Sequence, residues 1–172
     1  MELKTILEAV LFSSSRPVTS KQGSRRLEEF PLGDIEEAFQ ALIRDYAGAD
    51  RSVEIAEVAG GYQMRTRVEY RDIVKRFVKE KDVALSRPML ETLSIIAYKQ
   101  PVTKKEIDAV RGVDSARAIK HLLEKRLIDI AGRNGDAGKK MAFRTTPRFL
   151  EVYGLKSIED LPTYKEIESL EG

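Results

Sequence analysis

The sequence predicts a mainly helical α+β chain made of two tandem winged-helix domains, each a helix-turn-helix unit followed by a β-hairpin wing. A weak internal repeat and a shared order of elements carry this prediction. Pro17-Val18-Thr19 recurs as Pro101-Val102-Thr103, and each follows an apolar helical face. Further on, Val53-Glu54-Ile55-Ala56 matches Ile128-Asp129-Ile130-Ala131, a short apolar strand in both copies.

The distances between matched positions differ in a way that loops tolerate. Val18 and Val102 are 84 residues apart, Val53 and Ile128 are 75 apart, and Met64-Arg65-Thr66 lies 79 residues before Phe143-Arg144-Thr145. The first copy therefore has an insertion before its strands, and the second has one in its hairpin. Three matches in one order favour a true repeat over chance similarity.

In the first copy, Leu3, Ile6, Leu7 and Val10 follow the spacing of one helical face. The third helix buries a second apolar face, made of Ile35, Phe39, Leu42, Ile43 and Tyr46. Gly60-Gly61 is the turn signal of the wing. A linking helix over 70–79 and a polar joint over 79–82 then lead to the second copy.

In the second copy, the first helix has an apolar face of Leu90, Leu93, Ile96 and Ala97. The third helix is predicted over 115–126, with Asp114 as a candidate N-cap. Its inward residues are Ile119, Leu122 and Leu123, and the wing tip spans 134–139. We expect domains at 1–82 and 83–162, and a flexible acidic tail over 163–172.

Composition excludes several classes of function. The 172 residues include no Cys, no Trp and a single His, which leaves no disulfide framework and no Cys/His metal site. No phosphate-binding loop or metalloprotease motif is present, and His121 reads as a surface residue. We therefore expect no enzyme activity, no cofactor and no metal. The sequence has neither a signal peptide nor a membrane span, so it predicts a cytoplasmic protein.

The charge distribution contains evidence both for and against binding to nucleic acid. Residues 99–148 contain 13 Lys and Arg against 6 Asp and Glu, a net charge of +7. The faces that would enter a DNA groove carry acids, however. They are Asp114, Arg117, His121 and Glu124 in the second copy, and Glu36, Glu37, Gln40, Arg44 and Asp45 in the first. Acids on the inserted helix would face the phosphates, which argues against base reading.

Four stretches of the chain resemble the segregation and condensation protein B family, the accessory subunit of the bacterial condensin complex. They are "VEIAEVAGGYQMRTRVEY" (53–70), "LSRPMLETLSIIAYKQPVTKKEIDAVRGVDS" (85–115), "LLEKRLIDIAGR" (122–133) and "TTPRFLEVYGLKSIEDLP" (145–162). The segment 19–33 departs from the family pattern, because it is more polar and Gly23 interrupts it. A glycine inside a helix costs roughly 1 kcal/mol relative to Ala, so this helix is the weakest element predicted.

The resemblance implies a homodimer that binds the kleisin subunit, segregation and condensation protein A. Through the kleisin it would join the structural maintenance of chromosomes (SMC) ATPase. It would act in chromosome condensation and partition at the nucleoid, and would meet chromosomal DNA mostly indirectly. The alternative function is a dimeric winged-helix DNA-binding transcriptional regulator that uses the basic second domain.

Three groups of candidate site residues follow. Tyr98, Gln100, Pro101, Arg111 and Val113 are candidates for partner binding, because aromatic, Arg and exposed apolar residues are typical of interfaces. Leu3, Ile6, Leu7 and Val10 are candidates for dimerisation. Arg133, Lys139 and Lys140 are candidates for weak DNA contact. For the first two groups, packing inside the chain's own domain is an equal alternative.

Overall fold

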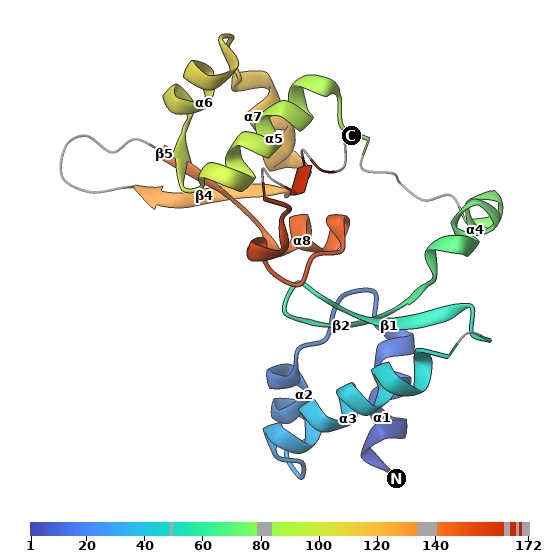
Figure 1. The fold of residues 1–172 in the computed structure, drawn as a ribbon. Coiled ribbons are helices and arrows are strands. Elements are labelled where there is room, and N and C mark those ends of the chain that lie inside the picture. The colour runs from blue at the N-terminus through green and yellow to red at the C-terminus, as the bar shows by residue number, and fades with distance from the viewer. Residues whose placement is uncertain (49, 79–83, 134–140, 164–165, 168, 170–172) are drawn as a thin grey trace. The chain divides into compact units, whose positions relative to one another are not determined.

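The computed structural model describes residues 1–48, 50–78, 84–133, 141–163, 166–167 and 169. The chain divides into two compact units. One runs from Met1 to Lys81 and also includes the segment that starts at Gly154, and the other runs from Asp82 to Tyr153. Each unit is helical with one small antiparallel sheet (Figure 1), as the sequence predicts for two winged-helix domains.

The first unit has the predicted order of three helices, a hairpin and a linking helix. Its elements are α1 (Leu3–Ser13), α2 (Ser20–Arg26), α3 (Leu32–Tyr46), β1 (Val53–Val58), β2 (Gly61–Thr66), the 3-10 helix η1 (Val68–Tyr70) and α4 (Arg71–Phe77). The core comes from α1, α3 and the hairpin: Leu7, Leu11, Ile35, Phe39, Leu42, Tyr46, Ile55 and Tyr62. The predicted inward face of α3 is confirmed, with Ile43 packed at the margin.

The second helix forms despite its polar sequence, and Gly23 is the reason that it fits. A Cβ built on Gly23 would lie 2.9 Å from Cγ2 of Ile35, so only glycine allows α2 to approach α3 this closely. At the start of α2, Gln22 N donates to Thr19 Oγ1 and Thr19 N donates to Gln22 Oε1. This capping box stabilises the seven-residue helix.

The second unit repeats this order with an extra short strand. Its elements are α5 (Arg87–Lys99), β3 (Val102–Thr103), α6 (Lys104–Arg111), α7 (Ala116–Glu124), β4 (Ile128–Arg133), β5 (Met141–Thr145) and α8 (Pro147–Tyr153). The strands pair in the order β3-β5-β4. On α5, the prediction for Leu90 is wrong, because Leu90 is exposed and the buried positions are Met89, Thr92, Leu93, Ile96 and Ala97.

The repeat is structural as well as sequential. Thr103 and Glu106 form the same capping box on α6 that Thr19 and Gln22 form on α2. In each unit the valine of Pro-Val-Thr pairs with the second hairpin strand, Val18 with Tyr62 and Val102 with Phe143. The two units therefore use one local design: a short bridge to the wing, then a capped helix.

The turn of the first wing lies one residue earlier than the sequence predicts. Val58 pairs with Gly61, so the two turn residues are Ala59 and Gly60, both with positive φ, which is the pattern of a two-residue hairpin turn. Gly61 lies in β2 instead, where a Cβ would come within 2.9 Å of the carbonyl oxygen of Val18. The Gly-Gly pair thus serves a turn and a close backbone approach.

The segment after α8 belongs to the first unit, whereas the sequence-based boundary of 162 assigns it to the second domain. Ala59 N donates to Leu155 O over 2.8 Å, and Gly60 N donates to Lys156 O over 3.0 Å. Lys156 Nζ lies 2.7 Å from Glu57 Oε2, and the 3-10 helix η2 (Ile158–Asp160) follows. The segment therefore satisfies backbone donors at the tip of the first wing.

Candidate partner-binding surface

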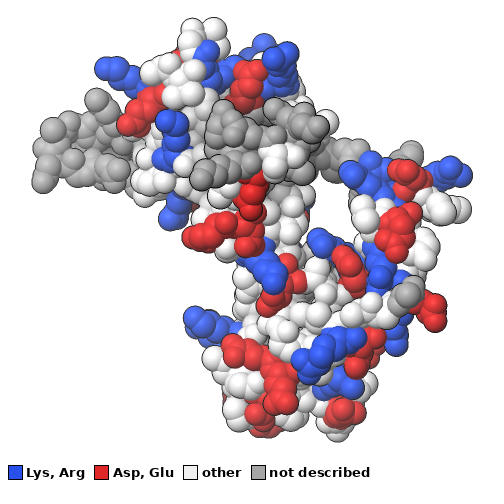
Figure 2. Space-filling model, viewed as in Figure 1, with Lys and Arg blue, Asp and Glu red and all other residues white. Residues whose placement is uncertain are grey.

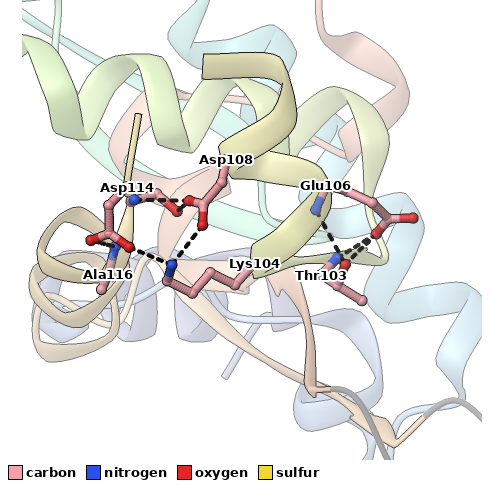
Figure 3. Close-up of polar contacts among 7 residues, drawn as sticks. Thr103, Lys104, Glu106, Asp108, Asp114 and Ala116 are labelled. Atoms are coloured by element: carbon pink, nitrogen blue, oxygen red, sulfur yellow. Dashed lines mark hydrogen bonds and ion pairs between the residues drawn. The ribbon is translucent and has the colours of Figure 1, made fainter. Parts of the chain in front are cut away.

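The turn between α6 and α7 is fixed by a network of charged and polar side chains, shown in Figure 3. Lys104 Nζ lies 2.6 Å from Asp108 Oδ2 and also bonds Asp114. Asp108 accepts from the backbone N of Ser115 over 2.8 Å and from its hydroxyl, and Ser115 is fully buried. Asp114 accepts from the N of Ala116 over 3.1 Å, at the start of α7. Hydrogen bonds and ion pairs therefore fix the turn that contains Val113.

The electrostatics of this network follow from its central ammonium group. The hydrogen bond from Lys104 is the main reason that the pKa of the Asp108 carboxyl is below its usual value, with the Ser115 hydroxyl second. Lys104 likewise lowers the pKa of Asp114, with the N–H of Ala116 second. The two carboxyls in turn raise the pKa of Lys104. All three groups are thus held in their charged forms at neutral pH.

Arg111 is placed inside the unit and not on its surface. Its side chain is only 7% exposed, its Nη2 lies 3.3 Å from Glu91 Oε2, and its Nε has no partner among the described residues. Arg111 therefore ties the end of α6 to the first half of α5. Its side chain supports the surface that a partner would meet.

Gln100 also forms its hydrogen bonds inside the unit. Its Oε1 accepts from the N and Oγ1 of Thr145, over 2.6 and 2.9 Å, and its Nε2 donates to Ala97 O over 3.3 Å. These bonds link the end of α5 to β5. Pro101, the next residue, is exposed and begins the bridge to α6.

Tyr98 and Val113 are on the surface, as the binding hypothesis requires. Tyr98 is 52% exposed near the end of α5, and Val113 is 56% exposed in the α6–α7 turn. Sequence reasoning missed two further exposed apolar residues, Leu90 on α5 and Val110 on α6. Leu90 and Tyr98 are eight residues apart on one helical face, about 12 Å along the axis. Leu90 lies three residues before the buried Leu93, so helical spacing alone does not show that it is exposed.

We call Leu90, Tyr98, Val110 and Val113 the α5–α6 face. These are four exposed apolar residues of α5, α6 and the turn after α6, and the Arg111–Glu91 ion pair joins α6 to α5. Exposed apolar side chains on a rigid support are what protein interfaces use as anchors. The face therefore suits a polypeptide partner better than a polyanion.

The predicted outward residues of the two recognition helices are confirmed to lie largely outward. Glu36, Glu37, Gln40 and Arg44 on α3 are exposed, as are Arg117 and Glu124 on α7, and His121 Nδ1 lies 3.1 Å from Glu124 Oε2. Figure 2 shows blue and red side chains interspersed on the face in view. Neither recognition helix offers a uniformly basic surface for DNA phosphates.

Of the candidate DNA contacts, only Arg133 lies within the described residues, at the end of β4. Lys139, Lys140 and the predicted wing tip lie outside them. Among the residues that the structure describes, no group of His, Cys, Asp and Glu gathers as a metal site would need. Within the same ranges, no helix is long and apolar enough to cross a membrane.

Some of the candidate dimerisation residues on α1 are buried in, or pack against, the first unit's own core. Leu7 is 1% exposed, and Leu3 packs against the same core. Ile6 and Val10 are half-buried, and Val10 lines an open groove between α1 and α2 of about 420 Å³. Little of this stripe is left for a second protein.

Comparison with known proteins decides the family. The model of the family "Segregation and condensation complex subunit ScpB" matches residues 5–164. The segregation and condensation protein B of Syntrophotalea carbinolica is 42% identical over 170 residues, 99% of this chain and 86% of that protein. This chain belongs to the ScpB family. The family is a non-catalytic part of the condensin complex that acts in chromosome segregation and condensation, as the resemblance implies.

Two solved structures are similar as well. The crystal structure of ScpB from Mycobacterium tuberculosis is 33% identical, and the match covers 90% of this chain and 96% of that chain with a TM-score of 0.41. A structure described as a dimer of the ScpB N-terminal domain complexed with an ScpA peptide is 24% identical. That match covers 44% of this chain and 93% of the other, with a TM-score of 0.40.

Proposed function

We propose that this ScpB-family chain acts as a homodimer that docks the kleisin subunit through the α5–α6 face of its second domain. Tyr98 and Val113 are the anchors, Pro101 lies beside them, and Arg111 and Gln100 hold the supporting helices in place. Exposure carries this proposal: Tyr98 and Val113 are about half exposed, whereas the Arg111 side chain is only 7% exposed.

The proposed partner segment is an extended or disordered stretch of the kleisin that orders on binding. Since ordering costs conformational entropy, affinity must come from a few apolar anchors rather than from many weak contacts. The SMC ATPase would be reached through the kleisin, which places the complex at the nucleoid. Chromosomal DNA would be met mainly through those partners, because the recognition helices carry both signs of charge.

Dimerisation is proposed to occur through the first domain. A chain of 172 residues divided into two units has two small cores, and burying further apolar surface between protomers would stabilise them. The first unit exposes large apolar side chains, including Phe12 and Phe77, that its own core does not use.

Calorimetric titration of the full chain with the purified kleisin subunit of the same bacterium tests the docking proposal. We expect Tyr98→Ala and Val113→Asp each to weaken binding by more than about 1 kcal/mol, the range of interface anchors. Met141→Asp is the matched control, since Met141 is an exposed apolar residue of the same unit on β5. Circular dichroism establishes that each variant is folded.

The outcomes separate the alternatives. If Met141→Asp and charge reversal at Arg133 abolish binding while the Tyr98 and Val113 variants bind normally, the wing is the docking site and the α5–α6 face is not. If the wild-type chain binds no kleisin but forms a sequence-selective DNA complex at physiological salt, with a dissociation constant of about 10⁻⁸ M or tighter, the regulator function is correct instead.

A further inference from the structure

Large apolar side chains exposed by the first unit gather in one short stretch. Val68, Tyr70, Ile73, Phe77 and Val78 all lie within η1, α4 and the residue that follows α4, and Phe77 is 85% exposed. Phe12 and Leu32 are the isolated exceptions besides Met1 among the described residues of this unit. No side chain of α4 is buried, and none belongs to the first unit's core. The stretch is therefore an apolar patch that the described residues of the first unit do not bury.

The apolar residues of the patch form a stripe along one side of α4, as in helices that pack on another surface. Tyr70, Ile73 and Phe77 are spaced i, i+3 and i+7, which places them along one stripe, with Val74 beside them. An isolated helix of seven residues is marginal in water, and α4 has no side-chain hydrogen bond at its N-cap. Packing of the apolar stripe on another surface would supply the missing stability.

The charged residues beside the stripe are complementary to the same residues in a second copy of the helix. Asp72 and Arg76 are four residues apart and flank the stripe on the same side. When two copies of the helix pack antiparallel about a two-fold axis near Val74, Asp72 of each copy lies opposite Arg76 of the other. The opposite flank carries Arg71 and Lys75 and would remain toward solvent. A two-fold contact needs only one patch, and this one matches its own copy.

We infer that α4 pairs antiparallel with α4 of a second copy of this chain, with Ile73 and Phe77 at the centre of the contact. The inference deepens the dimerisation part of the proposed function and rests on it. It moves the contact from α1, where Leu7 and Leu3 are already used by the core, to α4, where the apolar stripe is free of the core.

The size of the patch indicates how much of the dimer it can hold. An aromatic side chain buries about 150–250 Å² when fully covered, and a stable interface needs about 800 Å² from each partner. Phe77 with Ile73 and Val78 therefore forms the centre of an interface and not the whole of it. Val68 and Tyr70 extend it along η1.

Sedimentation equilibrium of the full chain at tens of micromolar provides the first test. We expect the wild type to be dimeric, and Ile73→Glu and Phe77→Glu to raise the dimer dissociation constant at least about tenfold. Both side chains are exposed, so the fold should survive, which circular dichroism checks. Phe12→Glu is the matched control, because Phe12 is an equally exposed aromatic residue of the same unit on α1.

Charge exchange provides the second test. Asp72→Arg alone and Arg76→Asp alone each place like charges opposite one another and should weaken the dimer. The double variant Asp72→Arg/Arg76→Asp should restore wild-type affinity, and an equimolar mixture of the two single variants should form heterodimers. Unchanged affinity in both single variants would overturn the antiparallel arrangement.

Cross-linking provides the third test. The sequence contains no Cys, so an introduced cysteine is the only thiol that can form a disulfide. Val74→Cys should form an intermolecular disulfide on mild oxidation, whereas Phe12→Cys should not. If the wild type is monomeric, the dimerisation proposal fails and α4 pairing fails with it. If the wild type is dimeric but Phe12→Cys cross-links and Phe77→Glu leaves the dimer intact, α4 pairing is wrong and dimerisation through the first domain stands.

Discussion

At Gly23 the backbone of α2 comes so close to α3 that one methyl group decides whether the helices can pack. Replacing Gly23 by Ala adds helix propensity worth about 1 kcal/mol but forces a Cβ into Ile35, and overpacking costs about 1–3 kcal/mol. We expect Gly23→Ala to destabilise the protein by about 1 kcal/mol in urea denaturation. Gly33→Ala, where the Cβ meets nothing within 4 Å, should be neutral or stabilising. Equal effects of the two variants would contradict this account.

Asp108 connects the pH dependence of stability to the order of the α6–α7 turn. The pKa of its carboxyl is lowered in the folded protein, so its contribution is present above the ordinary carboxyl pKa and is lost as the pH falls through the lowered value. We expect Asp108→Asn to lower the melting temperature at pH 7. The difference from wild type should shrink below about pH 4. A difference that stays constant from pH 7 to pH 3 would show that charge is not involved.

Among the elements, the first wing depends on a segment far away in sequence. The N–H groups of Ala59 and Gly60 donate to Leu155 and Lys156, so a chain truncated after Tyr153 leaves both donors to water. We expect amide exchange at Ala59 and Gly60 to accelerate roughly tenfold, about one net hydrogen bond. A chain truncated after Leu161 should retain wild-type exchange at both amides. If it also accelerates, residues beyond η2 hold the wing.

The helices and strands also show how much of the fold can be predicted from the sequence. The repeat predicts the winged-helix class and the order of helices and hairpins, because Pro-Val-Thr and the paired apolar strands are local signals. The spacing of Leu90, Leu93 and Ile96 predicts a buried Leu90, but Met89 and Thr92 complete the buried stripe of α5 instead. The need for a glycine at position 23 could not be predicted from the sequence, because it arises from the close contact with Ile35, twelve residues later along the chain.

For the whole molecule, the sequence predicts which residue types a partner-binding surface would use, but not which of these side chains already bond within the chain's own unit. Tyr98 and Val113 are exposed, whereas Arg111 and Gln100 bond inside the unit. Arg is a residue type enriched at interfaces, and only the tertiary structure shows that Arg111 pairs with Glu91. In the same way, Leu7 and Leu3 on α1 lie in or against the first unit's core, whereas no side chain of α4 belongs to that core.

Hydrogen–deuterium exchange of the full chain with and without the purified kleisin tests the central claim, docking on the α5–α6 face, most directly. It reports on every backbone segment at once and requires no mutation. We predict that kleisin slows exchange in peptides that cover 87–113 and leaves the wing strands β4 and β5 unchanged. Slower exchange confined to β4 and β5, with no change over 87–113, would contradict the claim.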